Sequence, residues 1–384
     1  MSACKVRTRL LHCSWALVLA AVAHVADAGV LPEDRADVLY HQYDGGGVKI
    51  DGPSLLMRKK FAEKYSVSAN YYVDLVSSAS IDVVTTASPY KEERQQLGLG
   101  FDMLNGKTQY SVGFTNSDEN DYTANQASFD ISQDMFGDLT TVSFGFSRGW
   151  DEVRRRDDDE FAESVDRRTW RLGVSQIVTP TLMLGLSYEL VSDEGYLNNP
   201  YRSVRYLDAD SPVGYAYQKE VYPHTRVSNA ASINARYFLP YRAAVYGEFR
   251  YFTDTWGIDS MTAKIGYTHP WREKWIFEAG YRFYDQAAAD FYSDLFPRAD
   301  AQNFLARDKE LSTFTSHMIT VGATYELPPL GWHFVQKSTV NLFYDQILYD
   351  YQDFRDVREG GTPGTEPAYS YDAGVIRLFF SGWF

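Results

Sequence analysis

Residues 182–190 read Leu-Met-Leu-Gly-Leu-Ser-Tyr-Glu-Leu, with an apolar side chain at every second position. Successive side chains of a β-strand point to opposite faces, so this period of two predicts a strand with one apolar and one polar face. The apolar face carries Leu182, Leu184, Leu186, Tyr188 and Leu190, and the opposite face carries Gly185, Ser187 and Glu189. The same alternation recurs near residues 96–103, 142–147 and 319–325. The sequence therefore predicts a protein built from amphipathic strands.

The length of these segments distinguishes a membrane barrel from a soluble β-sandwich. They run for roughly ten to fifteen residues, whereas the strands of soluble proteins average about 5–6. A strand of about 9–11 residues, tilted by about 45°, crosses a bilayer. After Ala28 no uninterrupted apolar run of about 18 residues remains, so the sequence does not predict a membrane-spanning helix.

Short turns alternate with long polar loops along the chain. The turns lie near 62–64, 105–107, 137–138, 179–181, 240–241, 272–274 and 328–331, and the loops near 77–92, 154–166, 195–225, 289–311 and 351–368. Short turns on one side and long loops on the other are typical of outer-membrane barrels. The predicted fold class is therefore all-β: a transmembrane, antiparallel, up-and-down β-barrel of about sixteen strands.

The strand count rests on parity. Counting back from the last strand, near 369–384, gives fifteen strands, and the earliest of them lies near 48–61. Single-chain bacterial barrels normally have an even number of strands, so Val38–Tyr43 should supply one more, with a turn at 44–47. The alternative is fourteen strands, with everything before Ala62 in the periplasm or the lumen. Residues 29–53 in particular could form a periplasmic or lumen-packed N-terminal segment.

The N-terminus has the features of a signal peptide. Lys5, Arg7 and Arg9 precede an apolar segment over 10–23, and residues 26–28 form a small-x-small cleavage pattern. We expect cleavage after residue 28, so that residues 29–384 form the barrel. Both cysteines, at positions 4 and 13, would then be lost, leaving no disulfide.

Composition agrees with an exported barrel. Aromatic residues make up 16% of the chain, which suits aromatic girdles at two membrane interfaces. The formal net charge is -14, which argues against a nucleic-acid partner. No cofactor is expected.

Charged residues in the predicted strands fall almost entirely on the polar face, which would line the lumen. The predicted lumen-lining residues are Asp74, Asp102, Asp130, Arg171, Glu189, Arg236, Glu248, Arg250, Lys264, Glu278, Arg282, Lys337 and Arg377. A charge facing lipid at the bilayer midplane costs about 2–4 kcal/mol for Arg or Lys, which explains this placement. Two interpretations remain open: a water-filled path, or a salt-bridged network that fills the lumen.

The last strand resembles the C-terminal signal read by the barrel-assembly machinery. Ile376, Leu378 and Phe380 alternate before the terminal Phe384. The expected partners are therefore that machinery, outer-membrane lipid and lipopolysaccharide. The charged run at 154–160 is expected to be solvated in an outer loop, although its four acidic residues could instead bind divalent cations at the lipopolysaccharide surface.

Motifs for catalysis are scarce. The histidines after the signal peptide, at 41, 224, 269, 317 and 333, lack the pair spacing of a metal site. Ser316 and His317 are adjacent on a strand, so their side chains point to opposite faces and cannot form a nucleophile–base pair. We therefore expect neither a catalytic nor a metal site.

Two stretches resemble a proteobacterial family catalogued as domain of unknown function thirty-five-seventy. They are DRADVLYHQYDGGG at 34–47 and NYYVDLVSSASIDVVTTASPY at 70–90. The resemblance implies an outer-membrane location and supplies no catalytic residues. The small, hydroxyl-rich residues at 77–90 are unusual for an outer loop and could fold into the lumen or dock a partner.

Three functions compete at this stage. The first is a pore or passive channel for small solutes, and the second is a scaffold around a periplasmic or lipoprotein partner. The third, an outer-membrane hydrolase, is disfavoured because no nucleophile has an evident partner.

Overall fold

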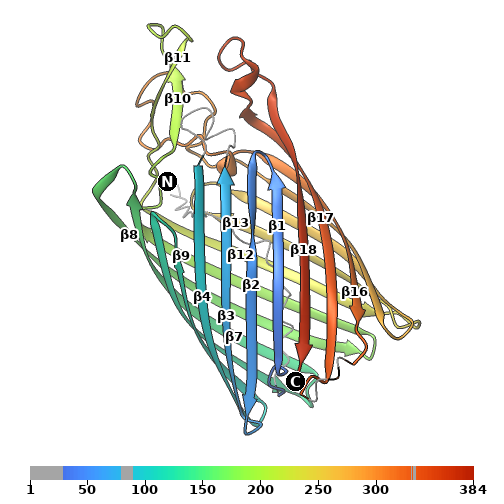
Figure 1. The fold of residues 1–384 in the computed structure, drawn as a ribbon. Helices are drawn as coiled ribbons and strands as arrows, with labels where there is room; N and C mark the ends of the chain where they lie inside the picture. Colours follow the sequence, from blue (N-terminus) through green and yellow to red (C-terminus); the bar gives the residue numbers. More distant parts are fainter. Residues whose placement is uncertain (1–28, 79–89, 330, 332–333) are drawn as a thin grey trace, which may run out of the picture.

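The computed structural model describes residues 29–78, 90–329, 331 and 334–384. Sixteen antiparallel strands close into one barrel, in which β1 pairs with both β2 and β18 (Figure 1). The predicted signal peptide and residues 79–89 of the hydroxyl-rich stretch lie outside the described residues. Among the described residues, no helix has the length and apolar character needed to cross a membrane.

Each barrel strand is long. They are β1 (Arg35–Gly45), β2 (Val48–Phe61), β3 (Tyr65–Ser78), β4 (Tyr90–Asn105), β5 (Thr108–Asp118), β6 (Tyr122–Met135), β7 (Thr140–Arg155), β8 (Asp158–Thr179), β9 (Leu182–Gly195), β12 (Thr225–Phe238), β13 (Ala244–Asp254), β14 (Asp259–Trp271), β15 (Trp275–Gln286), β16 (Phe314–Glu326), β17 (Lys337–Arg355) and β18 (Ala368–Trp383). The remaining elements are the hairpin of β10 (Ser203–Leu207) and β11 (Tyr215–Lys219) and two short 3-10 helices, η1 (Lys309–Leu311) and η2 (Val357–Glu359).

The prediction of sixteen strands is confirmed. Arg35–Gly45 forms β1, and a two-residue turn joins it to β2. Gly46 and Gly47 both have positive φ, of 59° and 79°, which a tight hairpin of this kind requires. The fourteen-strand alternative, which left everything before Ala62 outside the wall, is wrong.

The outer surface of the wall is apolar. Val174, Leu186 and Ile233 lie side by side on β8, β9 and β12, and Leu186 is 57% exposed on the monomer. Such a belt of exposed apolar side chains is what a bilayer would cover. The opposite phase of each strand faces the lumen, so Gly185, Ser187 and Glu189 point inward as predicted.

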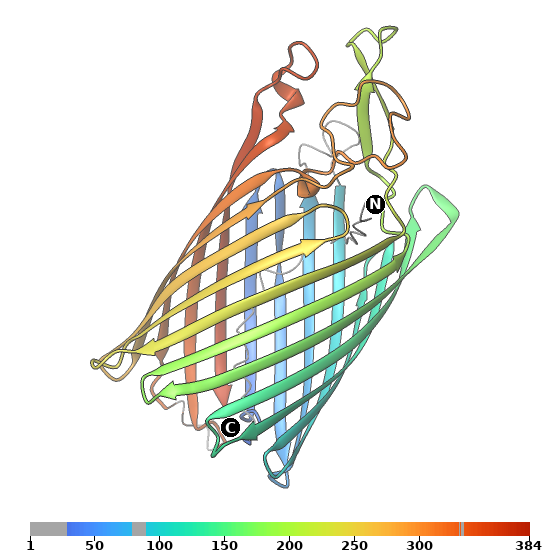
Figure 2. The same cartoon turned by 180° about the vertical axis from the view of Figure 1, so that it is seen from behind.

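The two ends of the barrel differ. Short connections and the C-terminus lie at one end, and the long loops lie at the other, where the β10–β11 hairpin rises above the rim (Figures 1 and 2). We call the long-loop end the outer end.

The prediction of a loop at 154–166 is wrong. Strands β7 and β8 continue into this region, and Arg154 pairs with Ala162. Beyond the apolar belt, strand pairing needs no alternation of apolar and polar residues, so the pattern gave no sign of this extension.

Candidate functional site

Four of the predicted lumen residues lie in one row across the inner wall. Register partners run from β4 to β9 in the order Asp102, Ser111, Asp130, Gly145, Arg171 and Glu189. We call these six residues the hydrated row. Because strand register cannot be read from one strand at a time, the sequence did not show that these residues are neighbours.

An ion pair in the hydrated row lies across a glycine. Arg171 Nη2 is 3.3 Å from Asp130 Oδ1, and Gly145 occupies the strand between them. A Cβ at Gly145 would lie 2.3 Å from Asp130 Oδ1 and 3.2 Å from Arg171 Nε. The missing side chain therefore lets the two charged groups meet against the wall.

The two side chains of this ion pair are partly exposed inside the closed barrel. The side chains of Arg171 and Asp130 are 46% and 44% exposed. Arg250 and Glu189, 3.0 Å apart, are 40% and 37% exposed. The described residues therefore leave these charged side chains accessible from the lumen.

Asp102 in the hydrated row has no cationic partner within the described part of the chain. Ser111 donates a hydrogen bond of 2.6 Å to Asp102 Oδ1. The neighbouring pair of Lys264 and Glu248, on β14 and β13, is 3.3 Å apart. Acidic and basic groups thus pair along the inner wall from Asp130 onward, whereas Asp102 is held by a hydroxyl group.

A second row lies across the closure of the barrel and is less exposed than the hydrated row. It contains Arg377 on β18, His41 on β1, Gly52 on β2, Asp74 on β3 and Arg94 on β4. We call these five residues the closure row. His41 Nε2 lies 2.8 Å from Asp74 Oδ1, and it reaches this carboxylate past Gly52. Both side chains are nearly inaccessible to solvent.

Tyr72 completes the surroundings of His41. Its ring stacks on the imidazole with centroids 4.8 Å apart, and its hydroxyl oxygen lies 3.0 Å from His41 Nε2. His41 Nδ1 is buried and has no hydrogen-bond partner among the described residues. The two family-like stretches, at 34–47 and 70–90, meet at this contact.

The other predicted lumen residues also lie on the inner face. Arg377 pairs with Asp345 at 2.7 Å, and Asp345 is a fully buried residue that the sequence analysis missed. Lys337 lies 3.3 Å from Glu326 near the short-turn end. Within the part of the chain that the structure describes, Arg236, Glu278 and Arg282 form no ion pair, although Glu278 lies close enough to Arg236 for electrostatic attraction.

The residues of the predicted assembly signal lie along the outer face of β18. Ile376 and Leu378 are exposed there, in phase with Phe380. The backbone N–H of Phe384 donates to Asp34 O at 3.3 Å, and Lys59 lies over its ring. The terminal residue therefore also helps to close the barrel.

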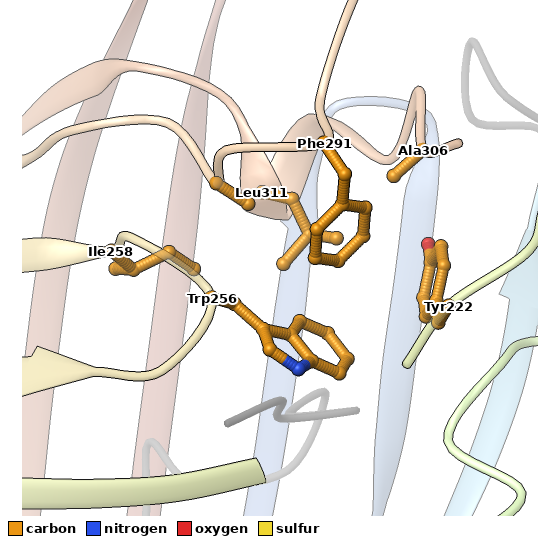
Figure 3. Close-up of a cluster of buried hydrophobic side chains, with 7 residues drawn as sticks. Tyr222, Trp256, Ile258, Phe291, Ala306 and Leu311 are labelled. Atoms are coloured by element: carbon orange, nitrogen blue, oxygen red, sulfur yellow. The ribbon is translucent and has the colours of Figure 1, made fainter. Parts of the chain in front are cut away.

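The outer end carries a folded cap, made of the loops 196–224, 255–258, 287–313 and 356–367. Trp256, Phe291 and Tyr222 gather at its centre, together with Leu311 and Ile258 (Figure 3). The ring centroids of Trp256 and Phe291 are 4.9 Å apart. This hydrophobic cluster joins three loops that are distant in sequence.

A buried ion cluster supports the cap. Arg205, on β10, is fully buried and binds the carboxylates of Asp294 and Glu366, with Nη1 2.5 Å from Glu366 Oε1. Arg307 lies 3.0 Å from Asp294 Oδ1. Burial alone would raise the pKa of Glu366, but hydrogen bonding to Arg205 holds it below its ordinary value. The cluster thus ties the hairpin to two other loops.

The cap is fixed to the barrel rim by β12 and β13. Arg226 lies over the Trp256 ring at 4.6 Å and binds Asp254 at 3.1 Å. The Trp256 backbone N–H donates to Asp254 Oδ1 at 2.8 Å. Sequence reasoning missed this cap, because the loops show no periodicity. The apolar residues Trp256, Phe291 and Leu311 in otherwise polar loops were the available signal.

Three carboxylates come together at the outer end. Single oxygens of Glu92, Glu119 and Asp121 lie within 4.8 Å of one another. Burial raises the pKa of Glu119 to about 7, and the neighbouring carboxylates add to this shift while Arg94 opposes it. In the acidic run at 157–160, for which cation binding was the less favoured alternative, Asp157 lies 2.6 Å from Arg155.

Solved structures with a similar overall fold are outer-membrane proteins. A bacterial polysaccharide outer membrane secretin matches with 9% identity and a TM-score of 0.49, over 92% of this chain and 100% of its own. A Pseudomonas aeruginosa FadL homologue matches with 10% identity and a TM-score of 0.44, over 92% and 91%. In-vitro folded OmpT of Vibrio cholerae matches with 9% identity and a TM-score of 0.43, over 93% and 100%. At these identities, nothing about their activities carries over.

Comparison with curated protein sequences finds no match. A family model described as "Protein of unknown function (DUF3570)" matches residues 9–330. This range includes both family-like stretches and most of the barrel strands. The chain therefore belongs to this family.

Proposed function

We propose that this protein is an outer-membrane channel that passes small hydrophilic solutes through a hydrated lumen. The observation that carries the proposal is the exposure of the ion pairs formed by Arg171 with Asp130 and by Arg250 with Glu189. Charged side chains in a filled lumen would be screened from water by their neighbours. These side chains remain more than one third accessible inside a closed wall.

The arrangement of the wall supports the same proposal. Side chains on the hydrated side lie along the wall, because glycines on the next strand leave room for them. Gly100 adjoins Ser68, Gly173 adjoins Ser143, and a Cβ at either glycine would come within 2.5 Å of the serine hydroxyl. Small residues on the inner face keep the space above them free for water.

The outer cap lies at the mouth of this path. Its hydrophobic cluster and its buried ion cluster give it a defined structure, as expected of an element that restricts entry. Small solutes are therefore favoured over large ones. Acidic and basic groups are balanced in the lumen, so the lumen should not select solutes for a large net charge of either sign.

Conductance across a planar bilayer tests the proposal. The purified chain, refolded in detergent and added to one side, should produce discrete conductance steps that persist at constant voltage. Heat-denatured protein from the same preparation is the control. Folded, inserted protein that gives no steps would reject the channel and favour the alternative of a scaffold around a periplasmic or lipoprotein partner.

A further inference from the structure

We infer that a pocket at the outer end of the protein binds a small zwitterion, an α-amino acid with an apolar side chain. Arg355 would hold the carboxylate of this ligand, and Asp353 would attract its ammonium group. The pocket has a volume of about 400 Å³, and sites for small ligands usually have volumes of about 300–1,000 Å³. This inference goes beyond the proposed channel function and does not depend on it.

The pocket lies where the loop 287–313 of the cap meets the outer end of β17. Its lining includes Tyr292, Asp294, Leu295, Asp353 and Arg355. Tyr292 is fixed there because its hydroxyl donates to the backbone oxygen of Asp353 at 3.3 Å. The ring of Tyr292 and the side chain of Leu295 give the pocket an apolar surface beside its charged groups.

Arg355 brings an unused positive charge to this pocket. Arg205 and Arg307 each bind a carboxylate, whereas no carboxylate of the described residues pairs with Arg355. Its Nη1 donates to Glu366 O at 2.6 Å, and its other two guanidinium nitrogens are neither bonded to a described residue nor buried. Such an edge of two N–H groups binds both oxygens of a carboxylate. Arg355 is therefore free to hold an anionic group of a ligand.

Asp353 brings the opposite charge to the same pocket. Its Oδ1 accepts from the Thr313 backbone N–H at 2.8 Å, and no cationic side chain in the described ranges pairs with it. Asp294, the other acidic residue in the lining, is already bound by Arg205 and Arg307. Asp353 and Arg355 line one pocket without binding each other. The pocket thus holds one uncompensated charge of each sign.

This pair of separate charges favours a ligand that carries both. A simple anion would satisfy Arg355 and leave Asp353 without a cation, and a simple amine would do the reverse. An α-amino acid has a carboxylate and an ammonium group on the same carbon, so it can satisfy both side chains together. Its own side chain would then lie against Tyr292 and Leu295.

Isothermal titration with L-leucine tests the site on the full chain, refolded in detergent. L-leucinamide lacks the carboxylate and N-acetyl-L-leucine lacks the ammonium group, so each serves as a probe with a single charge. L-leucine should bind, and each of these two should bind more weakly by about tenfold or more, as expected when a hydrogen bond to a charged group is lost.

Two variants of the pocket and one control locate the binding. Arg355→Gln and Asp353→Asn should each weaken L-leucine binding by about tenfold or more. Arg358→Gln is the matched control, because Arg358 lies outside the lining and already binds Asp356 through Nε and Nη2, at 2.8 and 2.6 Å. It should leave L-leucine binding unchanged.

Hydrogen exchange at the Leu207 amide, which donates to Phe296 O, shows whether the cap of each variant stays folded. Asp353→Asn keeps an oxygen for the Thr313 backbone N–H, so its cap should remain intact even if Arg355→Gln disturbs the loops.

The outcomes are distinct from those of the conductance measurement. Weakened binding in both pocket variants, with normal binding in Arg358→Gln, would support the inference. Equal binding of L-leucine and N-acetyl-L-leucine would show a site for anions and would overturn it. A protein with a folded cap that binds no L-leucine, or whose binding survives both pocket substitutions, would also overturn it. None of these results would bear on whether the lumen conducts.

Discussion

Two arginines in this molecule bind carboxylates in opposite surroundings. Arg205 in the outer cap is fully buried and binds Asp294 and Glu366, whereas Arg171 in the lumen is 46% exposed and binds Asp130. A buried pair holds its surroundings together, because breaking it leaves an uncompensated charge out of water. An exposed pair contributes little to stability, but its field extends into the lumen. Burial therefore separates the charges that hold the cap together from the charges that stay accessible in the lumen.

The largest loss of stability is expected for a substitution in the cap. Arg205→Ala should destabilise the cap locally by about 3–5 kcal/mol, since two buried carboxylates would lose their cation. Backbone amides that join the loops, such as Leu207 N–H to Phe296 O at 2.9 Å, should then exchange with solvent much faster.

Hydrogen exchange measured on the folded barrel checks this prediction. Arg298→Ala removes an exposed arginine that bonds only to nearby backbone carbonyls, and it serves as the control. Unchanged exchange at Leu207 in the Arg205 variant would contradict the role given to the buried cluster.

The next largest loss of stability is expected when a charge is added to the lipid-facing side of a strand, compared with the same charge on its lumen-facing side. Leu186→Arg should destabilise the barrel by about 2–4 kcal/mol if the residue lies near the bilayer midplane, because the new charge faces lipid. Ser187→Arg should cost much less, since water in the lumen solvates the guanidinium. Both variants add the same charge to β9, one residue apart. Urea unfolding in lipid vesicles compares them, and equal losses of stability would show that the assigned faces are wrong.

The cap should also depend on pH through Glu220. Burial raises the pKa of Glu220 to about 7, and the nearby Asp308 adds to the shift. The folded cap then binds more protons than the unfolded one between the ordinary value of 4.5 and about 7, so its stability should fall as pH rises through this window. Glu220→Gln should flatten this part of the pH profile of cap hydrogen exchange. A profile identical to that of the original chain would contradict the prediction.

The smallest effect on stability is expected at the exposed pair. Arg171→Gln should change the free energy of unfolding by no more than about 1 kcal/mol, because solvent screens the pair. The same urea titration in vesicles measures it beside Arg205→Ala. A loss as large as that of the cap variant would show that the two arginines do not differ as described.

The fold was largely predictable from the chain, because one physical rule governs every strand. A residue that faces lipid must be apolar, and its neighbours need not be, so the alternation at 182–190 recurs along the wall. The same rule identified the lumen face of Asp130 and Arg171. It could not show that these two lie on either side of Gly145, since register depends on pairing with other strands.

The structure of the outer cap could not be predicted from the alternation of apolar and polar residues. Its residues are placed by contacts between loops far apart in sequence, such as Arg205 with Glu366. No period of two or of 3.6 marks such contacts. The partner of Arg377 was missed for a related reason: Asp345 lies on β17 in phase with the lumen, but its position beside Arg377 depends on the register between β17 and β18.

The proposed channel function depends most directly on water filling the lumen beside the hydrated row. The chain has two cysteines, both before residue 28, so residues 29–384 offer a background without thiols. In this background Ser187→Cys and Leu186→Cys place one thiol on each side of β9. After refolding into vesicles, a charged, membrane-impermeant thiol reagent should label Ser187→Cys rapidly and Leu186→Cys hardly at all. Failure to label Ser187→Cys in folded protein, or equal labelling of both, would contradict a hydrated lumen lined by this face.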